Sequence, residues 1–246
     1  MSAPLLVLEG VHTHVGGYHL LHGVDLEVPA GELTLLLGRN GAGKTTTLRT
    51  IMGLWRASAG RIRFEGEDIT ARPTPAIAQA GIAYVPENMG VFGDLTVREN
   101  MLLAARGARR EEDLDRARLA WIFRLFPALE KFWQYPAGKL SGGQKQMLAV
   151  ARAIIEPRRL LLVDEPSKGL APAIAANMIA AFRELLERGT TILLVEQNFH
   201  FARQLGDTVA VMDDGRIVYR GSMESLARDE RLQHELLGLG RVAQAS

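Results

Sequence analysis

The chain has 246 residues, of which 47% are hydrophobic and 23% charged, and it carries a net charge of +1 with no cysteine. This length predicts between one and two domains and supplies enough chain for a hydrophobic core, which excludes a disordered polypeptide. The near-neutral charge argues against a strongly basic nucleic-acid-binding protein. The lack of cysteine excludes disulfides, thiolate metal sites and thiol nucleophiles.

The N-terminal segment MSAPLLVLEG has neither a basic stretch nor a long apolar stretch, so we expect no secretory signal. No apolar run exceeds five residues, whereas a membrane span requires ~18. We therefore expect a soluble chain, and any link to a membrane must come through a partner.

The first third of the chain reads mainly as strands. Leu33–Leu37 is a short apolar run between two glycines, the pattern of a buried strand, and a helix is expected directly after it. In chain order the expected elements are strands at Leu5–Glu9, Val24–Val28, Leu33–Leu37, Arg61–Phe64 and Ile82–Val85, with a helix from about Gly43 to Met52.

The middle of the chain reads as helices only. Thr96 to Glu99 forms a capping box that predicts a helix over Met101–Ala105, and the apolar spacing predicts another over 111–126. A second capping box, Ser141 to Gln144, predicts a helix that ends near Ile155.

Strands and helices alternate again after this block. The expected strands are Leu160–Val163, Thr190–Val195, Thr208–Met212 and Arg216–Tyr219, and the expected helices are Ile174–Arg188 and Phe199–Leu205. Asp213-Asp214-Gly215 indicates a hairpin between the last two strands. The alternation predicts an α/β fold with a mostly parallel sheet, in which residues 1–87 and 157–246 form the core lobe and residues 88–156 an inserted helical subdomain.

A phosphate-binding loop is expected between the third strand and the first helix. The segment matches GxxxxGK[ST], a pattern whose glycines let backbone N–H groups surround phosphate oxygens beside a helix N-terminus. Lys44 supplies a cation for the β- and γ-phosphates, and the Thr45 hydroxyl is a ligand for Mg²⁺. The expected nucleotide-binding residues are Gly38, Arg39, Asn40, Gly41, Ala42, Gly43, Lys44, Thr45 and Thr46.

Two carboxylates follow the apolar strand that begins at Leu160. Asp164 and Glu165 lie at its carboxyl end, where ligands bind in open α/β sheets. We expect Asp164 to hold Mg²⁺ and Glu165 to accept a proton from the water that attacks the γ-phosphate.

The segment Leu140-Ser141-Gly142-Gly143-Gln144 is a second helix start suited to an anion. LSGGQ, placed between the phosphate loop and Asp164, resembles the signature of ATP-binding cassette (ABC) ATPases, and the resemblance covers nearly the whole chain. It implies an ABC cassette with an antiparallel β edge over 5–28, in which two cassettes pack head to tail. Ser141, Gly142, Gly143 and Gln144 of one cassette would then contact the ATP bound by its partner.

Narrower similarities point to one branch of that family, the ATPase subunits of branched-chain amino acid importers. The segments that carry it are Tyr84-Val85-Pro86-Glu87, Ser167 to Pro172, Val195-Glu196-Gln197-Asn198 and Leu125 to Leu129. The resemblance implies a second ATPase subunit, identical or not, two transmembrane permease subunits and an extracytoplasmic solute-binding protein. It implies a location at the cytoplasmic face of the membrane, ATP and Mg²⁺ as cofactors, and no nucleic-acid partner.

Three positions depart from the wider family. Glu87 stands where glutamine is usual, and as a carboxylate it is expected near Mg²⁺ or the attacking water. Gln197 stands where a histidine usually contacts the γ-phosphate, and it can donate a hydrogen bond but cannot become cationic. Val15 stands where an aromatic residue stacks on adenine, so we expect His14 or Tyr18 to replace it and favour Tyr18.

Some polar clusters and apolar loop residues invite other interpretations. We interpret the histidines as scattered surface residues rather than a metal site, and the arginines as a solvated face because no aromatic residue interleaves with them. Met89, Val91 and Phe92 lie in a loop, where apolar side chains need a reason. The resemblance implies that they form a docking surface for a permease, with packing inside the chain as the alternative. The histidines are His12, His14, His19 and His22, and the arginines are Arg106, Arg109 and Arg110.

The sequence therefore predicts a Mg²⁺-dependent ATPase subunit of an importer for amino acids, with branched-chain ones favoured. Glu165, Lys44, Gln197 and Glu87 are its expected catalytic residues. The alternatives are a regulatory half with a slow site, an importer for another amino acid, an amide or urea, and a non-transport cassette. The last is disfavoured because such proteins usually carry two cassettes or a long coiled-coil insertion.

Overall fold

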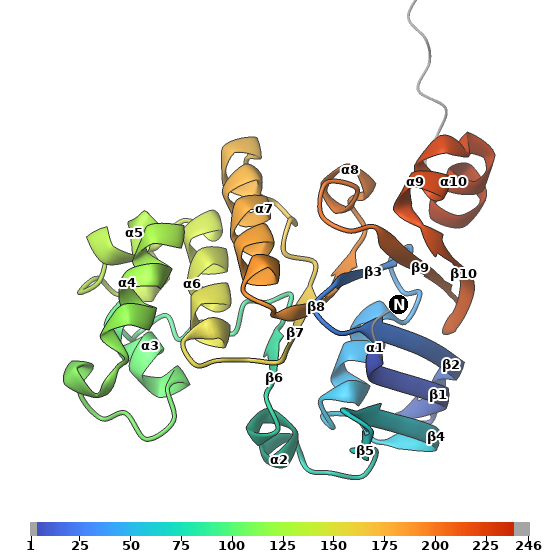
Figure 1. Cartoon of the computed structure of the whole chain (residues 1–246), viewed down its shortest axis with the longest axis horizontal. Helices are drawn as coiled ribbons and strands as arrows, with labels where there is room; N and C mark the ends of the chain where they lie inside the picture. Colours follow the sequence, from blue (N-terminus) through green and yellow to red (C-terminus); the bar gives the residue numbers. More distant parts are fainter. Residues whose placement is uncertain (1–3, 239–246) are drawn as a thin grey trace, which may run out of the picture.

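The computed structural model describes residues 4–238 and arranges them around two β-sheets with a group of helices at one side (Figure 1). The larger sheet has the strand order β10-β9-β3-β8-β7-β6. Its strands are β3 (Leu33–Leu37), β6 (Ile82–Val85), β7 (Leu160–Asp164), β8 (Thr191–Glu196), β9 (Thr208–Asp213) and β10 (Arg216–Ser222). All neighbours are parallel except β9 and β10, which form the expected antiparallel hairpin. The prediction of a mostly parallel sheet is confirmed.

The smaller sheet is antiparallel and has the order β2-β1-β4-β5. Its strands are β1 (Pro4–Val15), β2 (Tyr18–Pro29), β4 (Ala57–Phe64) and β5 (Glu67–Asp68). The predicted lengths of β1 and β2 were wrong, because each strand runs for 12 residues. Bulges shift the pairing of β1 with β2 at several points, and a bulge interrupts the alternation by which a strand is recognised.

The helices between β6 and β7 lie together at the left of Figure 1. They are α3 (Val97–Ala104), α4 (Arg116–Leu125), α5 (Pro127–Lys131) and α6 (Gly142–Ile154). Both predicted capping boxes form, at Thr96 and at Ser141. The helix expected from Glu111 begins instead at Arg116, because Glu111–Asp113 forms a 3₁₀ turn and the Asp115 side chain caps α4.

The remaining helices flank the sheets. They are α1 (Lys44–Ile51), α2 (Thr74–Gln79), α7 (Pro172–Glu187), α8 (Phe199–Ala202), α9 (Met223–Arg228) and α10 (Glu230–Leu237). The sequence did not reveal α2, α9 or α10, and α8 ends before the expected Leu205. Within the described part of the chain, no helix combines the length and apolar character that crossing a membrane would require.

Two hydrophobic cores occupy the two faces of the larger sheet. Leu33, Leu35 and Leu37 of β3 join the core shared with α3 to α7, and Leu36 joins the core under α1 and the smaller sheet. Successive side chains of a strand point to opposite faces, so a five-residue strand that is buried throughout is covered on both sides. This double cover fixes the carboxyl edge of the sheet, where the candidate site lies.

Candidate active site

The phosphate loop connects β3 to α1 at the carboxyl edge of the sheet, beside the loops that follow β7 and β8. Lys44 is 4% exposed, and its ammonium group donates hydrogen bonds to the carbonyls of Gly38 and Arg39, both at 3.0 Å. The same group lies 3.2 Å from Glu165 Oε1. The predicted cation and the predicted base thus form an ion pair.

Tight backbone packing shapes this loop. A Cβ atom on Gly38 would lie 2.3 Å from the carbonyl oxygen of Met212 in β9, and Gly43 has φ of 107°, in the left-handed region that favours glycine. Arg39 and Asn40 are exposed, and the Arg39 guanidinium donates 3.4 Å to the Glu235 carbonyl in α10. Gly41 is also exposed, whereas Ala42 and Thr46 are buried.

Asp164 ends β7 and is fully buried. It accepts a hydrogen bond from the Thr45 hydroxyl at 3.0 Å and another from the Tyr84 hydroxyl at 3.1 Å, one on each carboxylate oxygen. Burial raises the pKa of Asp164, and the two hydroxyl donors oppose that rise. Burial also raises the pKa of Tyr84, which keeps its hydroxyl protonated as a donor.

Tyr84 was not predicted as a site residue. It lies on β6, directly opposite Leu162 of β7, two positions before Asp164. Because alternate residues of neighbouring strands share one face of a sheet, this register brings its side chain to Asp164. Only the pairing of β6 with β7 indicates that Tyr84 belongs to the site.

Glu165 has φ of 46°, a left-handed conformation that is unusual for a residue with a side chain. Its backbone N–H donates to the Val195 carbonyl at 2.9 Å, and its side chain is 9% exposed. Gln197 follows β8 and is exposed, and its backbone N–H donates to Glu196 Oε2 at 3.1 Å. Glu196 is a second site residue that sequence reasoning missed.

Glu87 is exposed two residues after the end of β6, and it pairs with Lys168 Nζ at 2.5 Å. Glu87 and Glu165 both help to raise the pKa of Asp164, so three carboxyl groups of this edge interact. Glu87 holds the pKa of Lys168 above its usual value through this bond and its charge.

The LSGGQ segment does not join this cluster within one chain. Its helix α6 begins well apart from α1 in Figure 1. Ser141 Oγ accepts a hydrogen bond from the Gln144 N–H at 3.3 Å, and Gln144 Oε1 accepts one from the Ser141 N–H at 2.9 Å. A Cβ on Gly143 would lie 2.8 Å from Ile174 of α7, whereas one on Gly142 would meet nothing within 4 Å.

The β1–β2 hairpin carries the predicted adenine-binding residue at its tip, where Tyr18 is 75% exposed and pairs with Val15. The four histidines of this hairpin are not scattered, and that expectation was wrong. His14 and His22 each place their rings 4.0 Å from that of His19, and His12 donates to or accepts from His19 at 3.0 Å. Within residues 4–238, no group of three or more His, Asp or Glu side chains is arranged to hold a metal ion.

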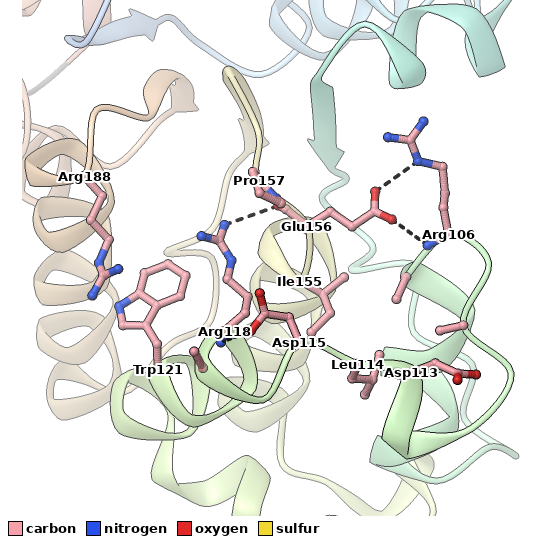
Figure 2. A pocket seen from close by; sticks show the side chains of 13 residues that line it. Arg106, Asp113, Leu114, Asp115, Arg118, Trp121, Ile155, Glu156, Pro157 and Arg188 are labelled. Carbon is pink, nitrogen blue, oxygen red and sulfur yellow. Dashed lines mark hydrogen bonds and ion pairs between the residues drawn. The ribbon is translucent and has the colours of Figure 1, made fainter.

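The basic segment after α3 borders a cavity of about 400 Å³ (Figure 2). Arg106 pairs with Glu156 at 3.1 Å, while the backbone N–H groups of Arg109 and Arg110 donate to Asp113. Trp121 lies between the guanidinium groups of Arg118 and Arg188, at 4.5 and 4.4 Å from its ring centre. The side chains of Arg106, Arg118 and Arg188 therefore serve contacts within the chain, whereas Arg109 and Arg110 are exposed.

The comparisons with known proteins identify the family. The family model described as "ABC transporter" matches residues 21–168. The chain belongs to this family. A high-affinity branched-chain amino acid transport ATP-binding protein of Pseudomonas aeruginosa is 40% identical over 95% of this chain and 100% of its own length. A protein of Archaeoglobus fulgidus named a probable branched-chain amino acid transport ATP-binding protein is 36% identical over 90% of this chain and 93% of its own.

Solved structures agree with this assignment. A nucleotide-free ATP-binding cassette from an ABC transporter superposes with a TM-score of 0.82 and 25% identity, covering 97% of this chain and all of its own. The ADP conformation of another cassette gives a TM-score of 0.80, with 94% of this chain and 97% of its own covered. The P-loop α/β cassette fold expected from the sequence is confirmed, and the protein is a nucleotide-binding ATPase subunit of an ABC transporter.

Proposed function

We propose that this cassette is the Mg²⁺-dependent ATPase subunit of an importer for branched-chain amino acids. The observation that carries the proposal is the convergence of Lys44, Thr45, Asp164 and Glu165 at one edge of the sheet. An intact set of this kind favours an active site over a regulatory half. The substrate class rests on the names of relatives that match along nearly the whole chain.

The residues of this edge bind the phosphates and activate the water that hydrolyses ATP. The backbone N–H groups of the loop and the Lys44 ammonium bind the phosphates, which separates Lys44 from Glu165. The Glu165 carboxylate then accepts a proton from a water molecule, the water oxygen bonds to the γ-phosphorus, and the bond to the bridging oxygen breaks with its electrons leaving on ADP. Gln197 donates a hydrogen bond to the γ-phosphate, and Tyr18 stacks on adenine.

The residues present fit Mg²⁺. The Thr45 hydroxyl oxygen and Asp164 Oδ1 lie 3.0 Å apart, and both are hard oxygen donors. Nucleotide sites usually hold Mg²⁺ through one or two such protein groups, with phosphate oxygens and water completing the shell. Mg²⁺ would neutralise charge that develops on the phosphates. Glu87, tied to Lys168, lies close enough to Asp164 to act on this site or on its water.

The LSGGQ segment does not join the phosphate loop of its own chain (Figure 1), and this suggests how cassettes assemble. We infer that Ser141 and the glycines after it bind the nucleotide held by a second cassette, identical or not. We further infer two transmembrane permease subunits and an extracytoplasmic solute-binding protein, with this cassette at the cytoplasmic face of the membrane.

A groove of about 630 Å³ supports permease docking. It is lined by Trp55 and Met89, and Phe92, 50% exposed, lies beside it against Arg152. Arg49 and Arg152 also line it, and in the described part of the chain neither forms an ion pair with an acidic side chain. The groove therefore suits a permease segment with apolar side chains and a carboxylate.

The role of Glu165 is tested by Glu165→Gln in the transporter purified through a tag on this chain. We expect ATP to bind and remain unhydrolysed, which traps a closed cassette dimer. Glu67→Gln, 75% exposed on β5, is the matched control and should hydrolyse ATP normally. If Glu165→Gln turns over ATP at the parent rate, the assignment of the base is wrong.

The docking surface is tested by a double variant, Met89→Ser with Phe92→Ser. Less permease should co-purify with it, whereas Val218→Ser, 48% exposed on β10, should leave assembly unchanged. Normal assembly of the double variant would contradict the docking proposal.

The solute is tested on the same purified assembly. A co-purifying solute-binding protein is identified and titrated with leucine, isoleucine and valine, and in parallel with other amino acids, amides and urea. Tight binding of leucine, isoleucine or valine supports the proposal. Preference for an amide or urea would show instead that the transporter imports that class of compound.

A further inference from the structure

A buried carboxylate at this edge has no role in the steps above. Glu196 ends β8 and is only 1% exposed. Placing an ionisable group out of water costs free energy unless hydrogen bonds compensate it, so such a group is retained where its bonds matter.

The bonds of Glu196 join two separate loops. Oε1 accepts the backbone N–H of Ser167 at 2.9 Å, in the loop that follows β7. Oε2 accepts the backbone N–H groups of Gln197 and Asn198, at 3.1 and 3.0 Å, in the loop that follows β8. One side chain thus satisfies three backbone donors, of which Ser167 lies 29 residues before it in the sequence.

The loop after β7 contains the proposed base. Glu165 lies two residues before Ser167 and holds a φ of 46° that needs support from its surroundings. Its N–H is bonded to Val195, the residue next to Glu196. The base is therefore fixed to β8 at two points, through Val195 directly and through the Glu196 carboxylate.

We propose that Glu196 is a positioning residue for ATP hydrolysis: its two carboxylate oxygens hold the loop of Glu165 and the loop of Gln197 in one fixed arrangement. This inference rests on the proposed function of Glu165 as the base. It concerns the placement of groups around the γ-phosphate, so it predicts an effect on turnover and not on the phosphate loop that binds ATP.

Glu196→Gln is the sharpest perturbation, because it preserves size and removes one acceptor. A glutamine offers one oxygen and one NH₂ group, so it must face at least one of the three N–H donors with a donor of its own. Glu196→Asp keeps the charge but is one methylene shorter, so it cannot span both loops. Each variant should release one loop while the strands on both sides remain paired.

The experiment compares kcat and the KM for ATP in the purified transporter assembly. We expect Glu196→Gln to lower kcat by about 10- to 100-fold, the effect of displacing a catalytic group by about 1 Å. The KM and the affinity for ATP should change by less than about twofold, since a group that acts only on the transition state leaves ground-state binding intact. Glu196→Asp should lower kcat in the same direction.

A matched control separates positioning from general stability. Glu99→Gln in α3 also removes a carboxylate that accepts a backbone N–H, that of Thr96 at 2.7 Å, but Glu99 is half-buried and lies in another element, far from the site in sequence. Its melting temperature should fall without a change in kcat. If Glu196→Gln behaves in the same way, Glu196 is structural only and the inference is overturned.

The double variant distinguishes the two proposals. Because Glu196 acts in part through Glu165, adding Glu196→Gln to Glu165→Gln should lower kcat by a smaller factor than Glu196→Gln lowers it in the parent. Full additivity overturns the positioning role. Parent-like turnover of Glu165→Gln alone instead overturns the proposed base, whatever Glu196→Gln does.

Discussion

The buried Asp164 carboxylate should weaken the fold in the absence of metal, and Asp164→Asn should therefore raise the melting temperature. Asp164 is fully inaccessible to solvent, and burial raises its pKa despite two hydroxyl donors. A pKa that is higher in the folded state than in the unfolded state means that folding disfavours the ionised form. At neutral pH the chain must fold with that ionised form, and asparagine removes this cost.

The expected magnitude follows from the contacts of the carboxylate. Desolvation of an ion costs several kcal/mol in real proteins, and hydrogen bonds to a charged group return ~1.5–3 kcal/mol each. Two such bonds offset most of the penalty, from Thr45 and Tyr84. Asparagine keeps both neighbours bonded, because the hydroxyls can rotate to donate or accept. A net gain of about 1–2 kcal/mol, or about 2–8 °C in Tm for a chain of this size, is expected.

Thermal melts in EDTA, without nucleotide, test this between pH 7.5 and the ordinary titration range of aspartate. The advantage of Asp164→Asn should be complete at neutral pH, shrink as pH falls through the raised folded-state pKa, and be gone below the unfolded-state pKa, where the parent is protonated in both states. Asp113→Asn is the opposite control. Backbone N–H groups of Arg109 and Arg110 lower the pKa of Asp113, so its substitution should lower Tm at neutral pH. A lower Tm for Asp164→Asn, or a gain independent of pH, would refute the reasoning.

Three further predictions concern packing and the phosphate loop. Phe182→Ala empties a fully buried position and should cost about 3–5 kcal/mol in urea unfolding, and a cost below 1 kcal/mol would contradict the packing described for α7. In Gly215→Ala the new Cβ would lie 2.3 Å from the Leu20 carbonyl oxygen. Because the Gly215 N–H donates to the Ala42 carbonyl in the phosphate loop, ATP titration should reveal weaker binding. Arg39→Ala removes the contact with α10, and limited proteolysis should then cleave α10 faster; unchanged cleavage would show that the contact does not hold the helix.

The central strands could be predicted from the sequence because burial on two faces leaves an unmistakable pattern. Leu33–Leu37 and Ile82–Val85 are observed with the expected bounds, since a strand covered on both sides is a continuous apolar run. The lengths of β1 and β2 were underestimated because bulges interrupt the alternation of apolar and polar residues along these strands. The helix α10 was missed although it is amphipathic: Leu232, Leu236 and Leu237 pack against the core, but none of its residues is fully buried.

Some site residues could likewise be predicted from the sequence and others could not. Lys44, Thr45, Asp164 and Glu165 stand in local motifs, and the structure brings their side chains together. Tyr84 and Glu196 act on groups 80 and 29 residues away, through strand pairing that no local pattern encodes. A tyrosine hydroxyl that donates a hydrogen bond and a glutamate carboxylate that accepts one are ordinary groups. Only the register of β6, β7 and β8 brings them to the site.

The position of LSGGQ has a consequence for how the site is completed. α1 and α6 both begin at a phosphate-recognising helix start, yet they lie apart in the chain (Figure 1). At α6 a Cβ on Gly142 would meet nothing within 4 Å, and the Ser141 side chain accepts a long bond of 3.3 Å, from the Gln144 N–H. A helix start that is exposed, free of a Cβ and electrostatically positive is suited to an anion brought from outside. We infer that each chain supplies half of two nucleotide sites, so binding at Lys44 and closure at Ser141 are separable steps.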